Sequence, residues 1–288
     1  MNGSKKECIL FLIVSEFILG NLPSKLLKSY YLGIDHPFKV RILSKIVQKF
    51  GIRLTVPYEK RGWITLNITD GVEDGILRNG FYEPEVWESL LPFAKNEEIF
   101  WDIGANIGGV SLRAGLNPLI KEVHSFEPNS RTRKILLNHV ALNPKSPITV
   151  HAVALSDKDE NRELALPPDE NSGVASLVIE NTNSSNRETV QCIKIDSLIR
   201  AKKLAYPSLI KIDVEGWELP VLVGAKELFK NHPPKAVVFE TLYRENEVTK
   251  MDPAISNFFL ENGYKLKHIA RSYDKLETVE NFLAYRSA

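Results

Sequence analysis

The chain has 288 residues, of which 43% are hydrophobic and 25% are charged, and its formal net charge is +1. This length allows one large α/β domain with an appendage, and the composition is that of a globular protein. A net charge this small gives no field that would recruit nucleic acid, so a nucleic-acid substrate is disfavoured. Cys8 and Cys192 match no metal or redox spacing, so we expect two ordinary thiols in a reducing, cytoplasmic compartment.

The first 80 residues are expected to form a separate segment. Apolar residues recur at helical spacing up to about position 50. Two alternating runs, Ile52–Val56 and Trp63–Ile68, then predict a small antiparallel element. The uncharged run Ile9–Val14 is well short of the ~20 residues that span a bilayer, so no membrane span is predicted. A weak peripheral membrane contact is the lesser alternative to a helix that packs on the main domain. The segment is predicted to cap the acceptor side of a domain formed by residues 81–288.

The main domain begins with helices and continues as alternating strands and helices. Helices are predicted over Ile76–Phe81 and Pro84–Leu91, where Pro84 suits a first helical position. From Ile99 onward the alternation is typical of a parallel α/β sheet. The predicted strands are Ile99–Ile103, Glu122–Phe126, Ile148–Leu155, Leu209–Asp213, Ala236–Phe239, Tyr264–Ile269 and Glu280–Tyr285. A polar insertion adds hairpin strands at Arg162–Leu166, Ala175–Ile179 and Thr189–Ile195, after which Asp196 is predicted to cap a short helix. Further helices are predicted over Asn129–Leu142, from the fourth strand to about Lys230, and over Asp252–Glu261.

The first strand of this sheet runs into a glycine turn that opens a helix. Gly104 suits a sharp turn or a close approach to a ligand, and Gly108 lets the helix sit near the strand. The motif is not G-x-G-x-x-G, because Asn106 stands inside it and Asp102 precedes it. The Asp102 carboxylate would repel a pyrophosphate but would suit a cationic group, such as the amino acid part of S-adenosylmethionine. A plain strand-to-helix turn is the simpler alternative.

An acid ends each of the first five predicted strands. Parallel strands bring their carboxyl ends to one edge of the sheet, where ligands bind in such folds. Each acid alone is ordinary as a helix cap or a solvated loop residue, but the set predicts a site. The five are Asp102, Glu127, Asp157, Asp213 and Glu240.

Position suggests roles for the residues at this edge. Glu127 follows the second strand, where an acid accepts hydrogen bonds from a ribose. Ser156 and Asp157 are candidates to hold an adenine amino group. Asp213 and Glu215 lie beside the expected reactive end of the cofactor, where a lysine on the same strand would balance their charge.

The layout resembles the FkbM family of S-adenosylmethionine-dependent methyltransferases. The resemblance covers roughly Gly80 to Glu240. It is carried by Asp102-Ile-Gly-Ala-Asn-Ile-Gly108, Phe126-Glu-Pro128, Ile210-Lys-Ile-Asp-Val-Glu-Gly216 with Glu218, Gly224-Ala225, Glu240 and Gly80-Phe-Tyr-Glu-Pro84. Gly109, where relatives often have an aromatic residue, and Trp217 depart from the pattern near the expected site.

The resemblance implies a Rossmann-like class I methyltransferase fold. This fold has a seven-stranded, mostly parallel sheet with helices on both faces, one antiparallel edge strand and a terminal hairpin. The implied activity is O-methylation of a hydroxyl on a sugar, glycan or secondary metabolite, with S-adenosylmethionine as cofactor. The predicted cofactor-binding residues are Glu83, Asp102, Gly104, Ala105, Asn106, Gly108, Glu127, Pro128, Ser156, Asp157 and Asp213, with Glu83 closing over the site.

Methylation of a hydroxyl needs help with its proton. The six histidines are badly placed or uncertain in position, so Asp213 or Glu215 is the predicted base. Alternatively, Asp213, Glu215 and Glu240 together could ligate Mg²⁺, although no spacing rule requires it. Trp217 is expected either to stack on a sugar ring or simply to pack.

Two other functional classes stay open at the level of sequence. One is an NAD-dependent oxidoreductase, against which Asn106 and the acid before Gly104 argue. The other is a non-catalytic binding module that has kept the fold. The sequence does not identify the small-molecule or glycan acceptor, and it carries no signal for the oligomeric state.

Overall fold

The computed structural model describes residues 53–59, 61–67, 73, 76, 80–166, 186–242, 251–270 and 279–287. The chain divides into two compact units, Met1–Tyr82 and Glu83–Ala288. The predictions for the helices up to position 50, for Cys8 and for the strand Ala175–Ile179 lie outside the described residues, and so does most of the helix predicted over Ile76–Phe81.

The described part of the first unit contains the predicted antiparallel pair. β1 (Leu54–Tyr58) pairs with β2 (Gly62–Leu66), which confirms the two alternating runs. Arg53 forms an ion pair with the buried carboxylate of Glu73, at 2.5 Å between Nη2 and Oε2. The role of residues 1–80 as a cap on the acceptor side stays a prediction.

The second unit is built on a seven-stranded sheet. Its order is β11-β12-β10-β9-β3-β4-β5. The pairings of β10 with β9, β9 with β3, β3 with β4 and β4 with β5 are parallel, and β12 is antiparallel to both of its neighbours. The strands are β3 (Glu98–Ile103), β4 (Ile120–Phe126), β5 (Ile148–His151), β9 (Leu209–Ile212), β10 (Ala236–Leu242), β11 (Lys265–Ile269) and β12 (Val279–Tyr285).

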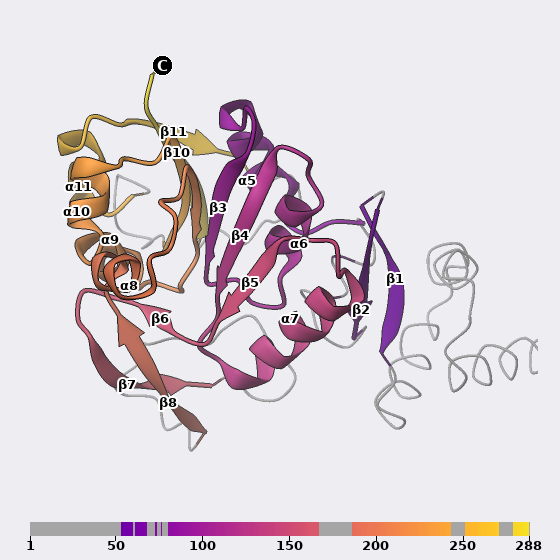
Figure 1. The fold of residues 1–288 in the computed structure, drawn as a ribbon. Coiled ribbons are helices and arrows are strands. Elements are labelled where there is room, and N and C mark those ends of the chain that lie inside the picture. The colour runs from indigo at the N-terminus through magenta and orange to yellow at the C-terminus, as the bar shows by residue number, and fades with distance from the viewer. Residues whose placement is uncertain are drawn as a thin grey trace, which may run out of the picture. The chain divides into compact units, whose positions relative to one another are not determined.

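Helices cover both faces of this sheet. They are α5 (Pro84–Leu90), the 3-10 turn η1 (Leu91–Phe93), α6 (Gly109–Gly115), α7 (Ser130–Leu142), α8 (Ile195–Lys202), α9 (Glu218–Val223), α10 (Lys226–Asn231) and α11 (Pro253–Glu261). In Figure 1, α8 to α11 lie on the left of the sheet, and α6 and α7 lie on its right. Strands covered in this way are apolar along their length, and every residue of β9 is buried. The predicted fold class is therefore confirmed.

The antiparallel strand does not lie at the edge of the sheet, contrary to our expectation. β12 inserts between β10 and β11, so β11 is the edge strand and runs parallel to the others. A hairpin prediction fixes that β11 and β12 pair, but it does not fix which of them pairs with β10. That choice depends on long-range pairing, which local sequence does not encode.

The third predicted strand is broken into two. β5 ends at His151, and β6 (Ala154–Leu155) joins a separate three-stranded sheet of order β6-β8-β7. β7 (Glu160–Ala165) and β8 (Arg187–Ile193) are antiparallel, as predicted for the insertion. The mostly apolar run Ile148–Leu155 therefore gave no sign of the change of sheet.

The long helix predicted after β9 is also interrupted. Gly224 separates α9 from α10, and a Cβ built there would lie 1.9 Å from the carbonyl oxygen of Ser156. Asp196 does not cap its own helix. Its carboxylate accepts hydrogen bonds from the backbone N–H groups of Glu227 and Leu228, in the first turn of α10. Among the described residues, no helix is both long enough and apolar enough to cross a membrane.

Candidate active site at the carboxyl edge of the sheet

The turn between β3 and α6 ties three strands together. Gly104 has φ +78°, and a Cβ there would lie 1.7 Å from the carbonyl oxygen of Asp213. The N–H groups of Gly104 and Ala105 both donate to the carbonyl of Phe126, at 3.0 Å each. The glycine is therefore required because the ends of β3, β4 and β9 meet here.

Asp102 lies completely buried beneath this turn. Its Oδ2 accepts a hydrogen bond from the Ser111 hydroxyl at 2.5 Å, and that hydroxyl also contacts the Ser125 hydroxyl at 2.7 Å. Among the described residues, its Oδ1 has no hydrogen-bond partner, and it lies 3.9 Å from Nζ of Lys211. Burial raises the pKa of Asp102, against the opposing attraction of Lys211. One oxygen of this carboxyl is thus available to a donor group of a ligand.

Lys211 balances the charge of two acids, as its place in the strand suggested. It stands opposite Asp102 in the β3–β9 register, and its Nζ lies 2.8 Å from Oδ2 of Asp213. Burial by itself would lower the pKa of Lys211, but Asp213 and Asp102 outweigh that effect and raise it. Lys211 therefore stays charged and forms an ion pair with Asp213.

Glu127 follows β4 and holds two backbone segments. Its Oε2 accepts a hydrogen bond from the N–H of Asn106 at 2.9 Å, and its Oε1 accepts one from the N–H of Asn129 at 2.8 Å. Burial raises the pKa of Glu127 to about 7. Asn106 adopts φ +50°, and its buried Oδ1 has no hydrogen-bond partner among the residues that the structure describes.

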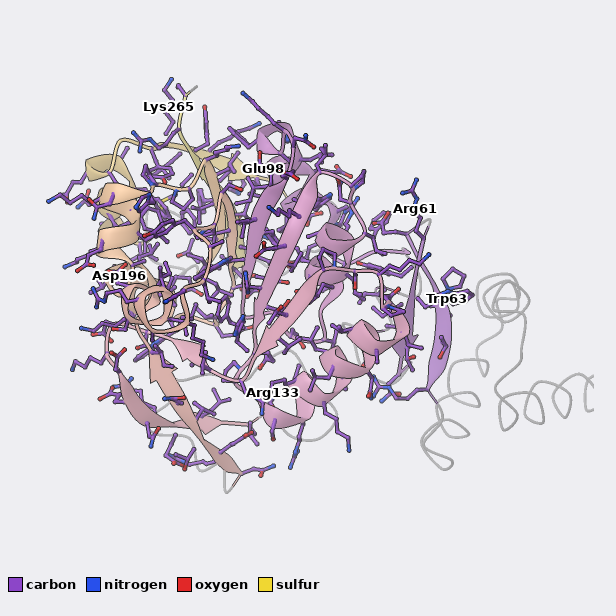
Figure 2. The ribbon with its side chains drawn as sticks, in the orientation of Figure 1. Arg61, Trp63, Glu98, Arg133, Asp196 and Lys265 are labelled. Carbon is purple, nitrogen blue, oxygen red and sulfur yellow. The ribbon has the colours of Figure 1, made fainter. Side chains whose placement is uncertain are left out.

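The carbonyls of Glu127 and Pro128 are fixed from the neighbouring helix. Both accept hydrogen bonds from Nη1 of Arg133, at 2.9 and 2.5 Å. Figure 2 shows Arg133 in the first turns of α7, on the lower side of the view, and Glu98 on the upper side at the amino end of β3. Arg133 therefore holds the segment Glu127–Pro128, which follows the carboxyl end of β4.

Three of the predicted acids converge after β9 and on β10. Ligand atoms of Asp213, Glu215 and Glu240 lie within 4.8 Å of one another. Glu240 lies inside β10 and not at its end, because the strand continues to Leu242. Burial first, and the charge of Asp213 second, raise the pKa of Glu215 to about 7. Glu215 is thus a carboxyl that can take up and release a proton near neutrality.

Glu218 fixes the loop that carries Glu215. Its Oε1 accepts hydrogen bonds from the N–H groups of Val214 and Gly216, at 3.1 and 3.2 Å. Burial raises the pKa of Glu218 to about 7. Glu218 is one of the residues that carry the family resemblance, but no role was predicted for it. Its place three residues after Glu215 was a signal for a contact that holds the loop.

Glu83 is brought to the same region. It has φ +41° and precedes α5, whose first residue is Pro84, as predicted. The charge of Glu83 contributes to the raised pKa values of both Lys211 and Glu215. Six non-glycine residues of the described chain have positive φ, and Glu83, Asn106 and Glu215 are three of them. Such strained conformations gather at functional sites.

Ser156 and Asp157 follow β6 and not a strand of the main sheet, which corrects the prediction of an acid at each main-sheet strand end. Ser156 is completely buried, and its Oγ lies 3.1 Å from Oδ1 of Asp157 and 3.1 Å from Nε1 of Trp217. Ser156 and Asp157 are connected to the loop that carries Glu215 through Trp217, which follows this loop.

Ser111 is a contributor that the sequence analysis missed. It lies in the first turn of α6, and its buried hydroxyl touches Asp102. Two of the histidines, His124 and His151, lie within β4 and β5 as predicted, with 3.0 Å between Nδ1 and Nε2. Their rings pack among core aromatics, so neither replaces a carboxyl at the site.

Comparisons with known proteins identify the family to which the chain belongs. The family model for the methyltransferase FkbM domain matches residues 102–266, which is more than half of the chain. A hexuronic acid methyltransferase, AglP of Haloferax volcanii, is 28% identical over 142 residues, which are 49% of this chain and 56% of that protein. The aligned region thus spans little more than half of that relative.

Solved structures of low identity also align with the chain. A methyltransferase FkbM from Methylobacillus flagellatus KT is 18% identical with a TM-score of 0.45, and the alignment covers 87% of this chain and 72% of that one. A precorrin-6y C5,15-methyltransferase from Geobacter metallireducens GS-15 is 15% identical with a TM-score of 0.41, covering 70% and 88%.

Proposed function

Because this chain belongs to the FkbM methyltransferase domain family, we propose that it transfers the methyl group of S-adenosylmethionine to a hydroxyl of a sugar, glycan or secondary metabolite. The observation that carries the proposal is the buried Oδ1 of Asp102, which has no hydrogen-bond partner within the described part of the chain and lies beside a turn too tight for any Cβ. A buried polar atom of this kind is costly unless a ligand satisfies it.

The residues present fit this cofactor. Asp102 would accept a hydrogen bond from the ammonium of the amino acid part, since a buried carboxylate favours a cation. Glu127 would accept from the ribose hydroxyls, because a carboxylate that already accepts two backbone N–H groups retains acceptor capacity. Asp157 would face the adenine, and the cofactor would supply an already activated methyl group.

Glu215 is the better of the two proposed bases. Oδ2 of Asp213 is already engaged by Nζ of Lys211 at 2.8 Å, so this carboxyl would have to give up that ion pair to take a proton. The pKa of Glu215, about 7, is matched to proton removal near neutral pH. When bound, the cofactor would supply its methyl carbon to the acceptor oxygen, with the sulfur departing as S-adenosylhomocysteine. Glu215 would take up the proton of the acceptor hydroxyl.

The acceptor belongs to the finer part of the proposal. AglP is named for a sugar acid, and that name supports a sugar or glycan acceptor over a secondary metabolite. A cytoplasmic location belongs to the same proposal, and the free, buried Cys192 thiol is compatible with it. Binding of an Mg²⁺ ion by Asp213, Glu215 and Glu240 is the alternative role of these carboxylates, and chelation distinguishes it from the role of Glu215 as a base.

Binding and turnover test the proposal separately. Calorimetry with S-adenosylmethionine, S-adenosylhomocysteine and NAD should show binding of the first two only, and the first two should raise the melting temperature by mass action. Radiolabelled S-adenosylmethionine should then transfer label to a member of a panel of nucleotide sugars, glycolipids and small hydroxylated metabolites. Binding of NAD alone would point to an oxidoreductase. Cofactor binding with no transfer to any class of acceptor would support a binding module instead.

A further inference from the structure

Trp217 joins two parts of the site that are 61 positions apart in the chain. It is the residue before α9, and its indole Nε1 lies 3.1 Å from the hydroxyl oxygen of Ser156. Ser156 is completely buried, and its backbone N–H donates to the carbonyl of Ile193 at 3.0 Å. The hydroxyl therefore stands at a fixed place, with the indole on one side and Asp157 on the other.

The chemistry of the three groups gives this contact a direction. An indole N–H can only donate, so the Ser156 oxygen must accept from Trp217. The hydroxyl has a single proton, and its other neighbour is Oδ1 of Asp157 at 3.1 Å. The proton therefore points at Asp157, and the hydrogen bond fixes the orientation of that carboxylate.

The indole itself is held in place from the insertion. The guanidinium carbon of Arg162, in β7, lies 4.6 Å from the centre of the Trp217 ring, and Arg162 also pairs with Glu160 at 2.8 Å. The ring is half-buried and packs against the core. Since an arginine covers one face, that face does not serve as a platform for a sugar ring, which was one of the two roles expected for Trp217.

Resting on the proposed function, we propose that Trp217 is a positioning residue that acts through Ser156 to aim the Asp157 carboxylate at the 6-amino group of the cofactor's adenine. Oδ1 receives the Ser156 proton, and Oδ2 is the oxygen assigned to the amino group. The relay selects adenine over hypoxanthine, because hypoxanthine presents a carbonyl oxygen at position 6, which a carboxylate repels.

The test compares S-adenosylhomocysteine with S-inosylhomocysteine by titration calorimetry. The wild-type protein should bind the adenine compound about 10- to 100-fold more tightly, which corresponds to one charge-assisted hydrogen bond. Trp217→Phe keeps a ring beneath Arg162 but removes the N–H donor, and Ser156→Ala removes the hydroxyl. Each should reduce the ratio of the two dissociation constants about 3- to 10-fold. The double variant should be no worse than either single variant, because both break the same relay.

Trp87→Phe is the matched control. Trp87 lies in α5 and packs edge-on against Phe100, away from the relay. This variant should lower the melting temperature and leave the ratio unchanged. A Trp217→Phe protein that loses affinity for both compounds equally, or for neither, would overturn the relay, and so would a wild-type protein that does not discriminate. If the wild-type protein binds neither compound, the proposed function fails, and the inference fails with it. Ser156→Ala gives the same decision if Trp217→Phe does not fold.

Discussion

The pKa values of buried glutamates are shifted in opposite directions at the two ends of the central sheet. At the amino end, burial would raise the pKa of Glu98, but hydrogen bonds from Lys235, Ser208 and the Lys95 backbone lower it overall. At the carboxyl end, burial wins, and the pKa values of Glu127, Glu215 and Glu218 rise to about 7. At the amino end, hydrogen bonds and an ion pair outweigh the cost of burial, whereas at the carboxyl end they do not. If the proposed function is correct, stability and function are separated along the strands.

The largest effect should follow from removing the proposed base. Glu215→Gln is expected to lower kcat about 100- to 10,000-fold, as general-base catalysis contributes about this much. The affinity for S-adenosylhomocysteine should change little. Glu227→Gln, an exposed change on α10, is the control and should retain full activity.

The pH profile checks the same assignment. With the pKa of Glu215 at about 7, wild-type kcat should rise about tenfold per pH unit up to neutrality and then level off, because the base must be deprotonated. Glu215→Gln should remove this rise. A variant with normal kcat and an unchanged profile would transfer the role of base to another residue.

At the opposite end of the sheet, the effect should be on stability alone. Lys235→Met removes the ammonium that lies 2.5 Å from Oε1 of Glu98, a carboxylate with only 4% of its side chain exposed. We expect a loss of about 1–2 kcal/mol, less than for a fully buried pair because the lysine is nearly half exposed. Urea unfolding would measure it, with the exposed Lys230→Met as control. A weaker affinity for S-adenosylhomocysteine in Lys235→Met would break the separation of the two ends.

Glu215→Gln should also gain stability, but only at higher pH. A carboxyl whose folded pKa is raised from 4.5 to about 7 favours the folded state below about pH 4.5, and this advantage is lost as the pH rises through 7. The variant avoids that loss, so it should be about 1–2 kcal/mol more stable than wild type at pH 8, after discounting for partial exposure. The difference should vanish at about pH 4, where the carboxyl is protonated in both the folded and the unfolded state. Urea unfolding at both pH values measures the difference in stability. Equal stability of the two proteins at pH 8 would mean that folding does not raise the pKa of Glu215.

Chelation should have the smallest effect. If Glu215 acts as a base without a metal, dialysis against EDTA should leave the transfer rate within about twofold of the untreated enzyme. A complete loss that Mg²⁺ restores would show instead that Asp213, Glu215 and Glu240 act as ligands. In that case Glu240→Gln should abolish the restoration by Mg²⁺.

Much of the site could be predicted because it consists of short segments at the ends of apolar strands. Asp102, Gly104 and Asn106 follow one strand, and Asp213 and Glu215 follow another, so parallel topology alone brings these segments to one edge. Lys211 could be placed with them because it stands on the same strand as Asp213. The helix N-terminus at Pro84 was also predictable, since proline is tolerated where no backbone donor is needed.

The features that the sequence did not predict depend on the surroundings of a residue in the folded chain. The run from Ile148 to Leu155 is mostly apolar, and nothing in it indicates that β6 leaves the main sheet for the insertion. The interruption at Gly224 follows from the carbonyl of Ser156, which is distant in sequence. The buried hydroxyl of Ser111 was overlooked because serine in a first helical turn is ordinary.

By itself, the sequence determined the strand-and-helix alternation, the glycine turn and the acids that follow the strands, because hydrophobic periodicity and turn chemistry are local properties. Only the tertiary structure decided that β12 inserts between β10 and β11, that Trp217 donates to Ser156, and which carboxyls become difficult to ionise. Those outcomes depend on which distant groups exclude water from one another, and burial of this kind is a property of the packed chain.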